Sequence, residues 1–105
     1  MSFAKSIDGF TIRLTYERWQ HISTGHPEVA DLYYEILQTV SEPDVIYDGG
    51  EGELIAVKLQ LQLNKHLIVV YKQSPLEKDG FVITAFVSRK LNYLSKKNVV
   101  WQSLK

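Results

Sequence analysis

Residues 53–72 read Glu53-Leu-Ile-Ala-Val-Lys-Leu-Gln-Leu-Gln-Leu-Asn-Lys-His-Leu-Ile-Val-Val-Tyr-Lys72 and predict two strands joined by a tight turn. Apolar residues recur at every second position from Glu53 to Leu61, which is the period of a strand with one buried face. Asn64 and Lys65 mark the turn, and the second strand runs from His66 to Lys72. This hairpin predicts the centre of an antiparallel sheet.

Other apolar segments predict further strands around this hairpin. Phe81 to Ser88 is the third long strand, and Val45 to Tyr47 is a short strand before the hairpin. Gly9 to Leu14 alternates over a short distance near the start of the chain. Near its end, Leu91 to Lys97 predicts a short helix, and Val99 to Trp101 is apolar enough to return as an edge strand.

Two helices are predicted between the first short strand and the hairpin. Thr15 can cap the first helix, which ends near Gly25 because glycine tolerates a positive φ. Pro27 suits the first position of a second helix. Apolar residues then recur at three- and four-residue spacing from Val29 to Val40, and Pro43 ends the helix. The predicted fold is α+β: two N-terminal helices packed on one face of a roughly four-stranded antiparallel sheet, with a short C-terminal helix.

The composition favours one small intracellular domain. A chain of 105 residues is the size of a single domain, so we assign residues 1–105 to one unit. It has no cysteine, which excludes disulfides and thiolate metal sites. The longest apolar run, Leu67 to Tyr71, is far shorter than the roughly 20 residues of a membrane helix. The N-terminus lacks the apolar run of a signal peptide, so we expect a cytoplasmic protein.

The net charge is zero, but the charges are unevenly distributed. Residues 26–54 contain eight acidic side chains and no Lys or Arg, whereas residues 81–105 contain five basic side chains and no acid. Such asymmetry can produce a local basic surface on a neutral protein. A solvated acidic helix face and a basic tail explain the same pattern, and the sequence leaves both interpretations open.

Strand register decides which polar residues share a sheet face. If Asn64 is the centre of a three-residue turn, Gln62 faces His66, and one face is almost wholly apolar. That face would receive the helices and would carry Ile55, Val57, Leu59, Leu61, Leu67, Val69, Tyr71, Phe81, Ile83, Ala85 and Val87. The opposite face would carry Lys58, Gln60, His66, Lys72, Thr84 and Ser88. A slip of one residue on the strand from His66 to Lys72 would exchange that strand's faces.

This polar face, with Arg89 just past its end, has the residue types that RNA cleavage requires. Attack by the 2′-hydroxyl of RNA needs a base for that hydroxyl, an acid for the leaving 5′-oxygen and cations for the phosphorane. Histidine suits the first two roles near neutral pH, and arginine grips phosphate. A solvent-facing sheet surface without any site has a similar composition.

The three histidines do not predict a metal site. His21 lies beside Trp19 and Ile22 and can be a half-buried structural residue, whereas His26 precedes Pro27 and can simply cap the second helix. His66 is far away in the sequence, and the spacing of His21 and His26 is not an established zinc spacing. Phosphate-binding and dinucleotide fingerprints are also absent from the sequence. We therefore expect no metal and no cofactor.

Three segments together resemble a known group of proteins: Arg13-Leu-Thr-Tyr-Glu-Arg-Trp-Gln-His-Ile22, Gly25-His-Pro-Glu28 and Ser41-Glu-Pro-Asp-Val-Ile46. They resemble the phage-associated nuclease-like families of the barnase–EndoU–colicin–RelE superfamily. The resemblance implies two N-terminal helices against a four-stranded antiparallel sheet. It also implies a metal-independent endoribonuclease, a hydrolase that binds RNA, found among toxins of toxin–antitoxin pairs and phage-derived effectors.

The resemblance also implies site residues. His21 and His26 match motif positions of the family, and the last strand with its exit would supply the rest: Thr84 or Ser88, with Arg89 and Tyr93. Lys58, His66 and Lys72 are candidate substrate-binding residues on the face argument alone. The neutral net charge departs from the basic character of many ribonuclease toxins. A non-catalytic interaction domain of the same fold therefore stays open, as do an antitoxin or other protein partner and a homodimer formed through an exposed edge strand.

Overall fold

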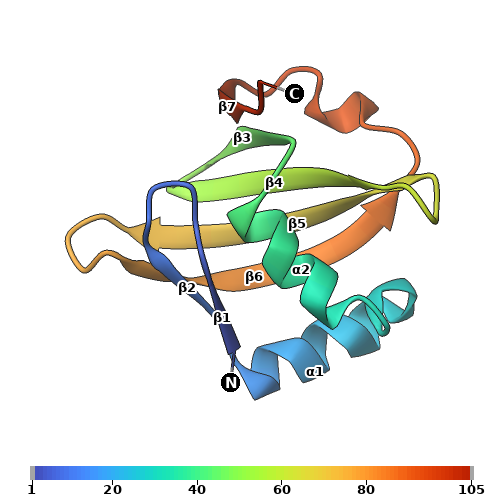
Figure 1. Ribbon diagram of the computed structural model, residues 1–105, viewed down its shortest axis with the longest axis horizontal. Coiled ribbons are helices and arrows are strands. Elements are labelled where there is room, and N and C mark those ends of the chain that lie inside the picture. The colour runs from blue at the N-terminus through green and yellow to red at the C-terminus, as the bar shows by residue number, and fades with distance from the viewer. Residues whose placement is uncertain (1, 105) are drawn as a thin grey trace.

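A seven-stranded mixed sheet runs through the protein, in a computed structural model that describes residues 2–104 (Figure 1). The strand order is β1-β2-β6-β5-β4-β3-β7. Neighbouring strands are antiparallel except β2 and β6, which run parallel. The strands are β1 (Ser2–Lys5), β2 (Thr11–Leu14), β3 (Val45–Gly50), β4 (Glu53–Gln60), β5 (Lys65–Ser74), β6 (Asp79–Ser88) and β7 (Val99–Gln102).

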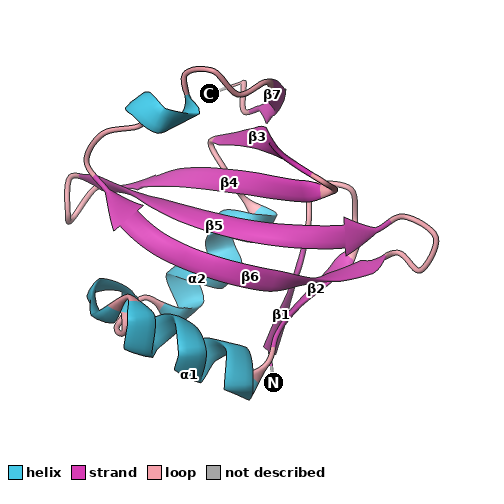
Figure 2. Cartoon of the chain, turned by 180° about the vertical axis from the view of Figure 1, so that it is seen from behind, coloured by secondary structure: helices cyan, strands magenta, loops and turns pink. Residues whose placement is uncertain are grey.

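Two α-helices pack on this sheet from different directions. The helix α1 (Tyr16–Gly25) begins where the Thr15 hydroxyl accepts a hydrogen bond from the Arg18 N–H at 3.2 Å. It lies beside β6, whereas α2 (Tyr33–Ser41) crosses one face of the sheet (Figures 1 and 2). Two 3-10 turns, η1 (Pro27–Val29) and η2 (Asn92–Leu94), complete the described secondary structure. Within residues 2–104, no helix has the length and apolar character needed to cross a membrane.

The predicted architecture of two N-terminal helices on a four-stranded antiparallel sheet is wrong. The hairpin of β1 and β2 precedes both helices, and the sheet has seven strands. The strand β1 has four residues, too few to show a clear alternation in the sequence, whereas β2 lies within the strand predicted from Gly9 to Leu14. The parallel pairing of β2 with β6 joins distant segments, and an ion pair of 2.5 Å between Arg13 and Asp79 fastens it. Local periodicity carries no information about such a pairing.

Two predicted helices are shorter than expected. Pro27 begins only a 3-10 turn, and α2 starts at Tyr33. Near the end of the chain, only residues 92–94 of the segment 91–97 form a 3-10 turn. In both places, apolar residues three positions apart suggested an α-helix. A single 3-10 turn has the same spacing, because residues i and i+3 lie on the same side of it.

The register of β4 and β5 differs from the predicted one. Leu59 lies opposite His66 and Gln60 opposite Lys65, so four residues form the turn, and Asn64 adopts a φ of 52°. The faces of β5 are thus exchanged relative to the prediction, because opposite residues share a face. The sequence could not discriminate between the registers, because both faces of these central strands are apolar.

A bulge in β6 also changes which residues share a face. Val70 pairs with Thr84, but the next residue, Tyr71, pairs with Val82, which leaves Ile83 as an extra residue on β6. Phe81, predicted on the covered face, therefore lies opposite Lys72 on the other face and is 47% exposed.

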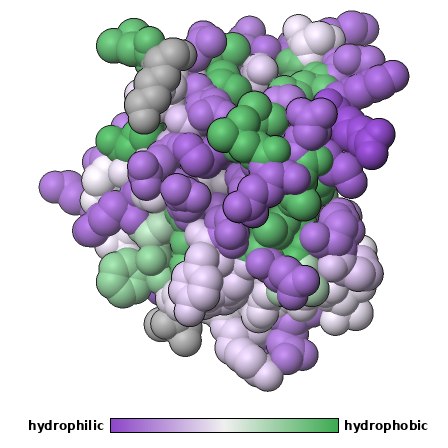
Figure 3. Space-filling view, turned by 45° about the vertical axis from the view of Figure 1, so that its right-hand side comes forward, coloured by the Kyte–Doolittle hydropathy of each residue, from purple (hydrophilic) through white to green (hydrophobic). Residues whose placement is uncertain are grey.

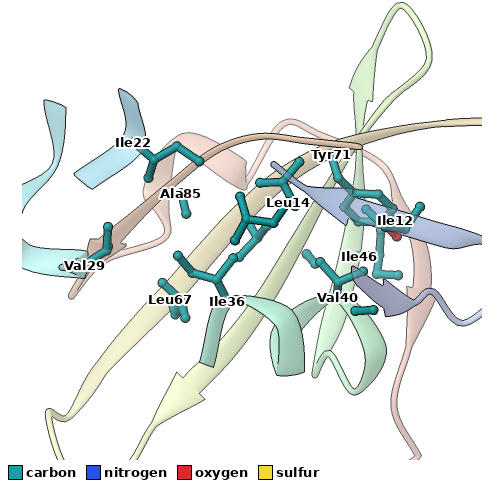
Figure 4. Close-up of a cluster of buried hydrophobic side chains, with 14 residues drawn as sticks. Ile12, Leu14, Ile22, Val29, Ile36, Val40, Ile46, Leu67, Tyr71 and Ala85 are labelled. Carbon is teal, nitrogen blue, oxygen red and sulfur yellow. The ribbon is translucent and has the colours of Figure 1, made fainter. Parts of the chain in front are cut away.

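The sheet has a hydrophobic cluster on each face. We call the face that α2 covers the helix face; Ala56, Leu67, Val69 and Tyr71 belong to it, and Figure 4 shows its packing. We call the opposite one the far face. It carries a smaller cluster of Ile55, Val57, Ile68 and Leu94, with Phe86 and Leu91 packed against it. The face predicted to be open and polar is therefore partly a second core, covered by the C-terminal segment.

Tyr71 gives a testable consequence of this packing. Its side chain is fully buried, and its hydroxyl has no hydrogen-bond partner in the described part of the chain. Burial, with a smaller contribution from Asp8, raises the pKa of Tyr71 to about 12. An unfolded tyrosine has a pKa near 10, so above that value the unfolded state loses its proton first and stability falls.

We expect Tyr71→Phe to remove this alkaline loss. Between pH 7 and pH 11, the unfolding free energy of the wild-type protein should fall by about 1.4 kcal/mol more than that of the variant. At pH 7 the variant should be as stable as wild type or more so, because an unpaired hydroxyl is removed. Chemical denaturation at both pH values measures this, with the exposed Tyr34→Phe as control. Equal alkaline losses in wild type and Tyr71→Phe would contradict the assignment.

Candidate functional site

Three neighbouring rings mark one end of the far face. The imidazole of His26 lies 5.7 Å from the ring of Phe86, measured between centroids, and Phe86 lies 6.1 Å from Tyr93. The rings are tilted by 32° and 39°. They come from three separate parts of the chain: the junction of α1 and η1, strand β6, and the turn η2. The fold thus brings together residues that are distant in the sequence.

His26 reaches Phe86 because the helices occupy the side of β6 that β2 leaves free. The strand β2 pairs only with residues 79–81 of β6, and beyond them α1 and η1 contact β6. His26 is the C-cap of α1, and its N–H donates to the Ile22 carbonyl at 2.8 Å. Its side chain makes no capping hydrogen bond to η1, so the alternative of a simple capping role is not supported. Instead, His26 Nδ1 lies 3.4 Å from a Glu28 carboxylate oxygen, which can orient the imidazole.

A second histidine lies across β6 from the first. His66 on β5 is directly opposite Ser88, the last residue of β6. It lines a hollow of about 350 Å³ together with Leu59, Leu63, Asn64 and Arg89. Its Nδ1 is buried without a hydrogen-bond partner among the described residues. The Ser88 hydroxyl donates to the Lys90 carbonyl at 2.6 Å, so it shapes the turn that carries Arg89.

The segment 89–97 gives this end of the sheet a positive charge. It contains Arg89, Lys90, Lys96 and Lys97 and no acidic residue. Within residues 2–104, none of these four cations forms an ion pair. Tyr93 lies in the same segment, and burial, with a smaller contribution from Tyr47, raises its pKa. Its phenol therefore stays protonated near neutral pH and can donate a hydrogen bond.

The other four predicted site residues, beginning with His21 and Lys58, lie away from this cluster. His21 is exposed on α1 in a shallow hollow of about 360 Å³ with Thr15, Glu17 and Arg18. Although this hollow is slightly larger than the one at His66, it has no buried polar group and no second histidine among its lining residues. Lys58 lies on the helix face, where its ammonium donates to the Glu42 carbonyl at 2.7 Å. The prediction that Lys58 and Gln60 share a face with His66 is therefore wrong.

Lys72 and Thr84 lie on the far face but outside the cluster. Thr84 is opposite Val70 in the middle of the sheet, and Lys72 is opposite Phe81 at the other end of β6. Of the nine predicted site residues, the structure therefore gathers five at one end of the far face: His26, His66, Ser88, Arg89 and Tyr93.

Sequence reasoning missed Phe86 and Glu28. Phe86 has the same parity as Ser88 on an expected strand, so an aromatic residue on the polar face was a signal that could have been used. Glu28 follows His26 by two residues, and only the η1 turn brings its carboxylate back to the imidazole.

The cluster combines two imidazoles, a guanidinium and two further aromatic rings. Such groups can transfer protons and bind a phosphate with its neighbouring base. Within residues 2–104, no three His, Asp or Glu side chains gather in a way that could hold a metal ion.

Comparison of the chain with models of protein families, with characterised proteins and with solved structures finds no match. The resemblance to nuclease-like families therefore stays a prediction, and the function must be argued from the geometry of this cluster.

Proposed function

We propose that the protein is a metal-independent endoribonuclease that cleaves RNA by attack of a 2′-hydroxyl on the adjacent phosphate. The observation that carries this proposal is the position of two imidazoles around the end of β6. His26 approaches from the helix junction on one side and His66 from β5 on the other, with Phe86 and Ser88 between them. A sugar–phosphate over this part of β6 would have a proton-transfer group on each side.

The reaction needs one proton acceptor and one proton donor. His26, oriented by Glu28, takes the proton of the 2′-hydroxyl as that oxygen attacks phosphorus. The bond from phosphorus to the 5′-oxygen breaks, and protonated His66 gives its proton to the departing oxygen. The products are a 2′,3′-cyclic phosphate and a free 5′-hydroxyl, with no change in oxidation state.

The remaining groups bind and stabilise. Arg89 shares the hollow with His66, and its guanidinium matches the charge of the phosphorane. The flat faces of Phe86 and Tyr93 suit a base beside the cleaved bond. Ser88 acts by holding the Arg89–Lys90 turn, because its hydroxyl proton is already donated to Lys90. The wider role proposed from the resemblance is that of a toxin or phage-derived effector.

Incubation of the pure protein with RNA in excess EDTA tests this proposal. We expect fragments that end in 2′,3′-cyclic phosphate, because the scheme uses no metal and no external nucleophile. The matched control is the same RNA with a single 2′-deoxy nucleotide at the main cleavage position, which should stay intact there. If wild-type protein leaves RNA uncut under these conditions, or if the deoxy substrate is cut equally, the proposal fails.

A second function, a protein-interaction domain, is favoured by a different surface. Leu59, Leu61 and Leu63 are 37%, 83% and 45% exposed around the β4–β5 turn. They line a groove of about 300 Å³ beside Leu32 and Glu35. Figure 3 shows hydrophobic side chains reaching the surface among polar ones on the side that carries this turn. Such a surface is typical of a contact with another protein.

The two functions give opposite results in one experiment. An interaction domain forms a stable complex with a partner protein and does not turn over RNA, whereas an endoribonuclease digests RNA as an isolated chain. Leu59 and Leu63 also line the hollow of His66 and Arg89, so a partner bound there would cover the proposed site. An inhibitory partner, such as an antitoxin, is therefore compatible with the first function.

A further inference from the structure

A row of alternating aromatic and cationic side chains crosses the far face at the opposite end of β6. Phe3 pairs with Arg13, Arg13 pairs with Phe81, and Phe81 pairs with Lys72. These residues come from four adjacent strands, β1, β2, β6 and β5, and paired residues point to the same face. Neighbouring strands are about 4.8 Å apart, so the row is continuous. We call it the Phe81 row.

The Phe81 row is exposed and held in place. Phe3 and Phe81 are 62% and 47% exposed, which is unusual for two phenylalanines on one small domain. Arg13 lies between them, and its guanidinium is fixed by Asp79 at 2.5 Å. Phe81, Lys72 and Arg13 also line a hollow of about 240 Å³ at this end of the sheet. The row is thus exposed, and its guanidinium is held in place by a carboxylate.

The same strand connects the Phe81 row to the candidate site. Phe81 and Phe86 both belong to β6 and both lie on the far face, because the bulge at Ile83 changes the alternation between them. Because of the bulge, the five steps from Phe81 to Phe86 lie opposite only four steps of β5, from Ile68 to Lys72, so the two rings are about 13 Å apart along the strand. Beyond β6, the far face of β4 and β5 is covered by Leu94 and Leu91. Figure 2 shows β6 running along this face from the region of β2 towards the end near α1.

We propose that this face of β6 binds an extended single strand of RNA, with one base stacked on Phe86 and Tyr93 and another on the Phe81 row. This inference rests on the proposed function and names the form of its substrate. Aromatic side chains stack on bases that are not already paired and stacked in a duplex. Two ring surfaces about 13 Å apart cannot both be used by a mononucleotide, so the substrate is a strand of several nucleotides.

The two ends of β6 differ in charge, and we therefore expect them to bind RNA in different ways. At the Phe81 row, Asp79 neutralises Arg13, and Glu53 lies opposite Lys72, so stacking supplies the affinity there. At the other end, the four cations of the segment 89–97 have no ion-pair partner within residues 2–104 and attract phosphates. Each phosphate contact lowers the logarithm of the binding constant as the logarithm of the salt concentration rises, with a slope of roughly 0.7 for single strands. Stacking adds nothing to this slope.

Binding of a non-cleavable 2′-deoxy oligonucleotide of about ten nucleotides tests this, measured by fluorescence anisotropy. Phe81→Ala should raise the Kd by roughly 5- to 150-fold, the loss expected for one stacked base, with an unchanged salt slope. A dinucleotide, which reaches only one end, should bind the variant and wild type alike. Tyr34→Ala removes an exposed ring from α2 on the other face and should change nothing. Phe3→Ala gives a second test of the row if Phe81→Ala does not fold.

The outcomes separate this inference from the proposed function. If the long strand binds Phe81→Ala and Phe3→Ala as tightly as wild type, or binds wild type no better than the dinucleotide, the Phe81 row is not a subsite. RNA cleavage in EDTA could still occur and would keep the proposed function. Binding that depends on Phe81 without any cleavage of RNA would support the row and overturn the endoribonuclease. A duplex that binds as tightly as the single strand would also contradict the inference.

Discussion

Replacing Gly80 by alanine is expected to lower the free energy of unfolding by about 3 kcal/mol or more. A Cβ atom at Gly80 would lie 2.0 Å from the carbonyl oxygen of Lys72 and 2.8 Å from the Cα of Gln73. Both are backbone atoms of β5, so the clash cannot be relieved by turning a side chain. It falls where β6 joins both β5 and β2, because Gly80 pairs with Gln73 and with Ile12.

Gly25→Ala is the matched control for this prediction. A Cβ atom at Gly25, the last residue of α1, would meet nothing within 4 Å. Its stability should be unchanged or raised by up to about 1 kcal/mol, since alanine restricts the unfolded chain. Urea unfolding of the two variants measures the difference. Equal midpoints would show that β5 and β6 are not packed as closely as described.

Removing either imidazole beside β6 is expected to slow RNA cleavage by roughly 10²- to 10⁴-fold, the usual contribution of one proton-transfer group. This applies to His26→Ala and His66→Ala separately, because each has one proton to move in the proposed reaction. His21→Ala serves as the matched control: it changes an exposed histidine on α1 that lies in a different hollow. Its rate should stay within a few-fold of wild type.

Initial rates on a short RNA in EDTA measure these effects, with thermal melting to show that each variant is folded. The side chain of His26 is 41% exposed, so its truncation should leave the fold intact. A large loss in His21→Ala, or rates in His26→Ala and His66→Ala near that of wild type, would place the chemistry elsewhere.

Elements with a strong local signal could be predicted from the sequence. Thr15 caps α1 as expected, and the long strands lie close to their predicted positions. The helix ends at Gly25 as predicted, but without the positive φ on which that prediction rested. The strand β1 and the parallel pairing of β2 with β6 could not be predicted, because each depends on a distant partner. The register of β5 was also inaccessible, since Ile55, Val57, Leu67 and Val69 make both faces of the central hairpin apolar.

The candidate site was predictable in part for the same reasons. His26, Ser88, Arg89 and Tyr93 lie in one region, as expected for the helix junction and the exit of the last long strand. His66 was assigned to their face correctly because it lies opposite Ser88, as the prediction required. The error in register lay between β4 and β5 and therefore fell on the residues of β4. Lys58 was misplaced because it lies opposite Leu67 on the helix face, where its ammonium donates to the Glu42 carbonyl at the end of α2.

The most direct test of the proposed site is an NMR footprint of a non-cleavable 2′-deoxy single strand on the isotope-labelled protein. We predict that the backbone amides of His26, residues 86–89 and Tyr93 change their chemical shifts, with those near Phe81 following when the strand is long. The amides of α2 on the opposite face and of β7 at the sheet edge should stay unchanged. Shifts confined to α2, to the β4–β5 leucines or to β7, or no binding at all, would contradict an RNA site on the far face.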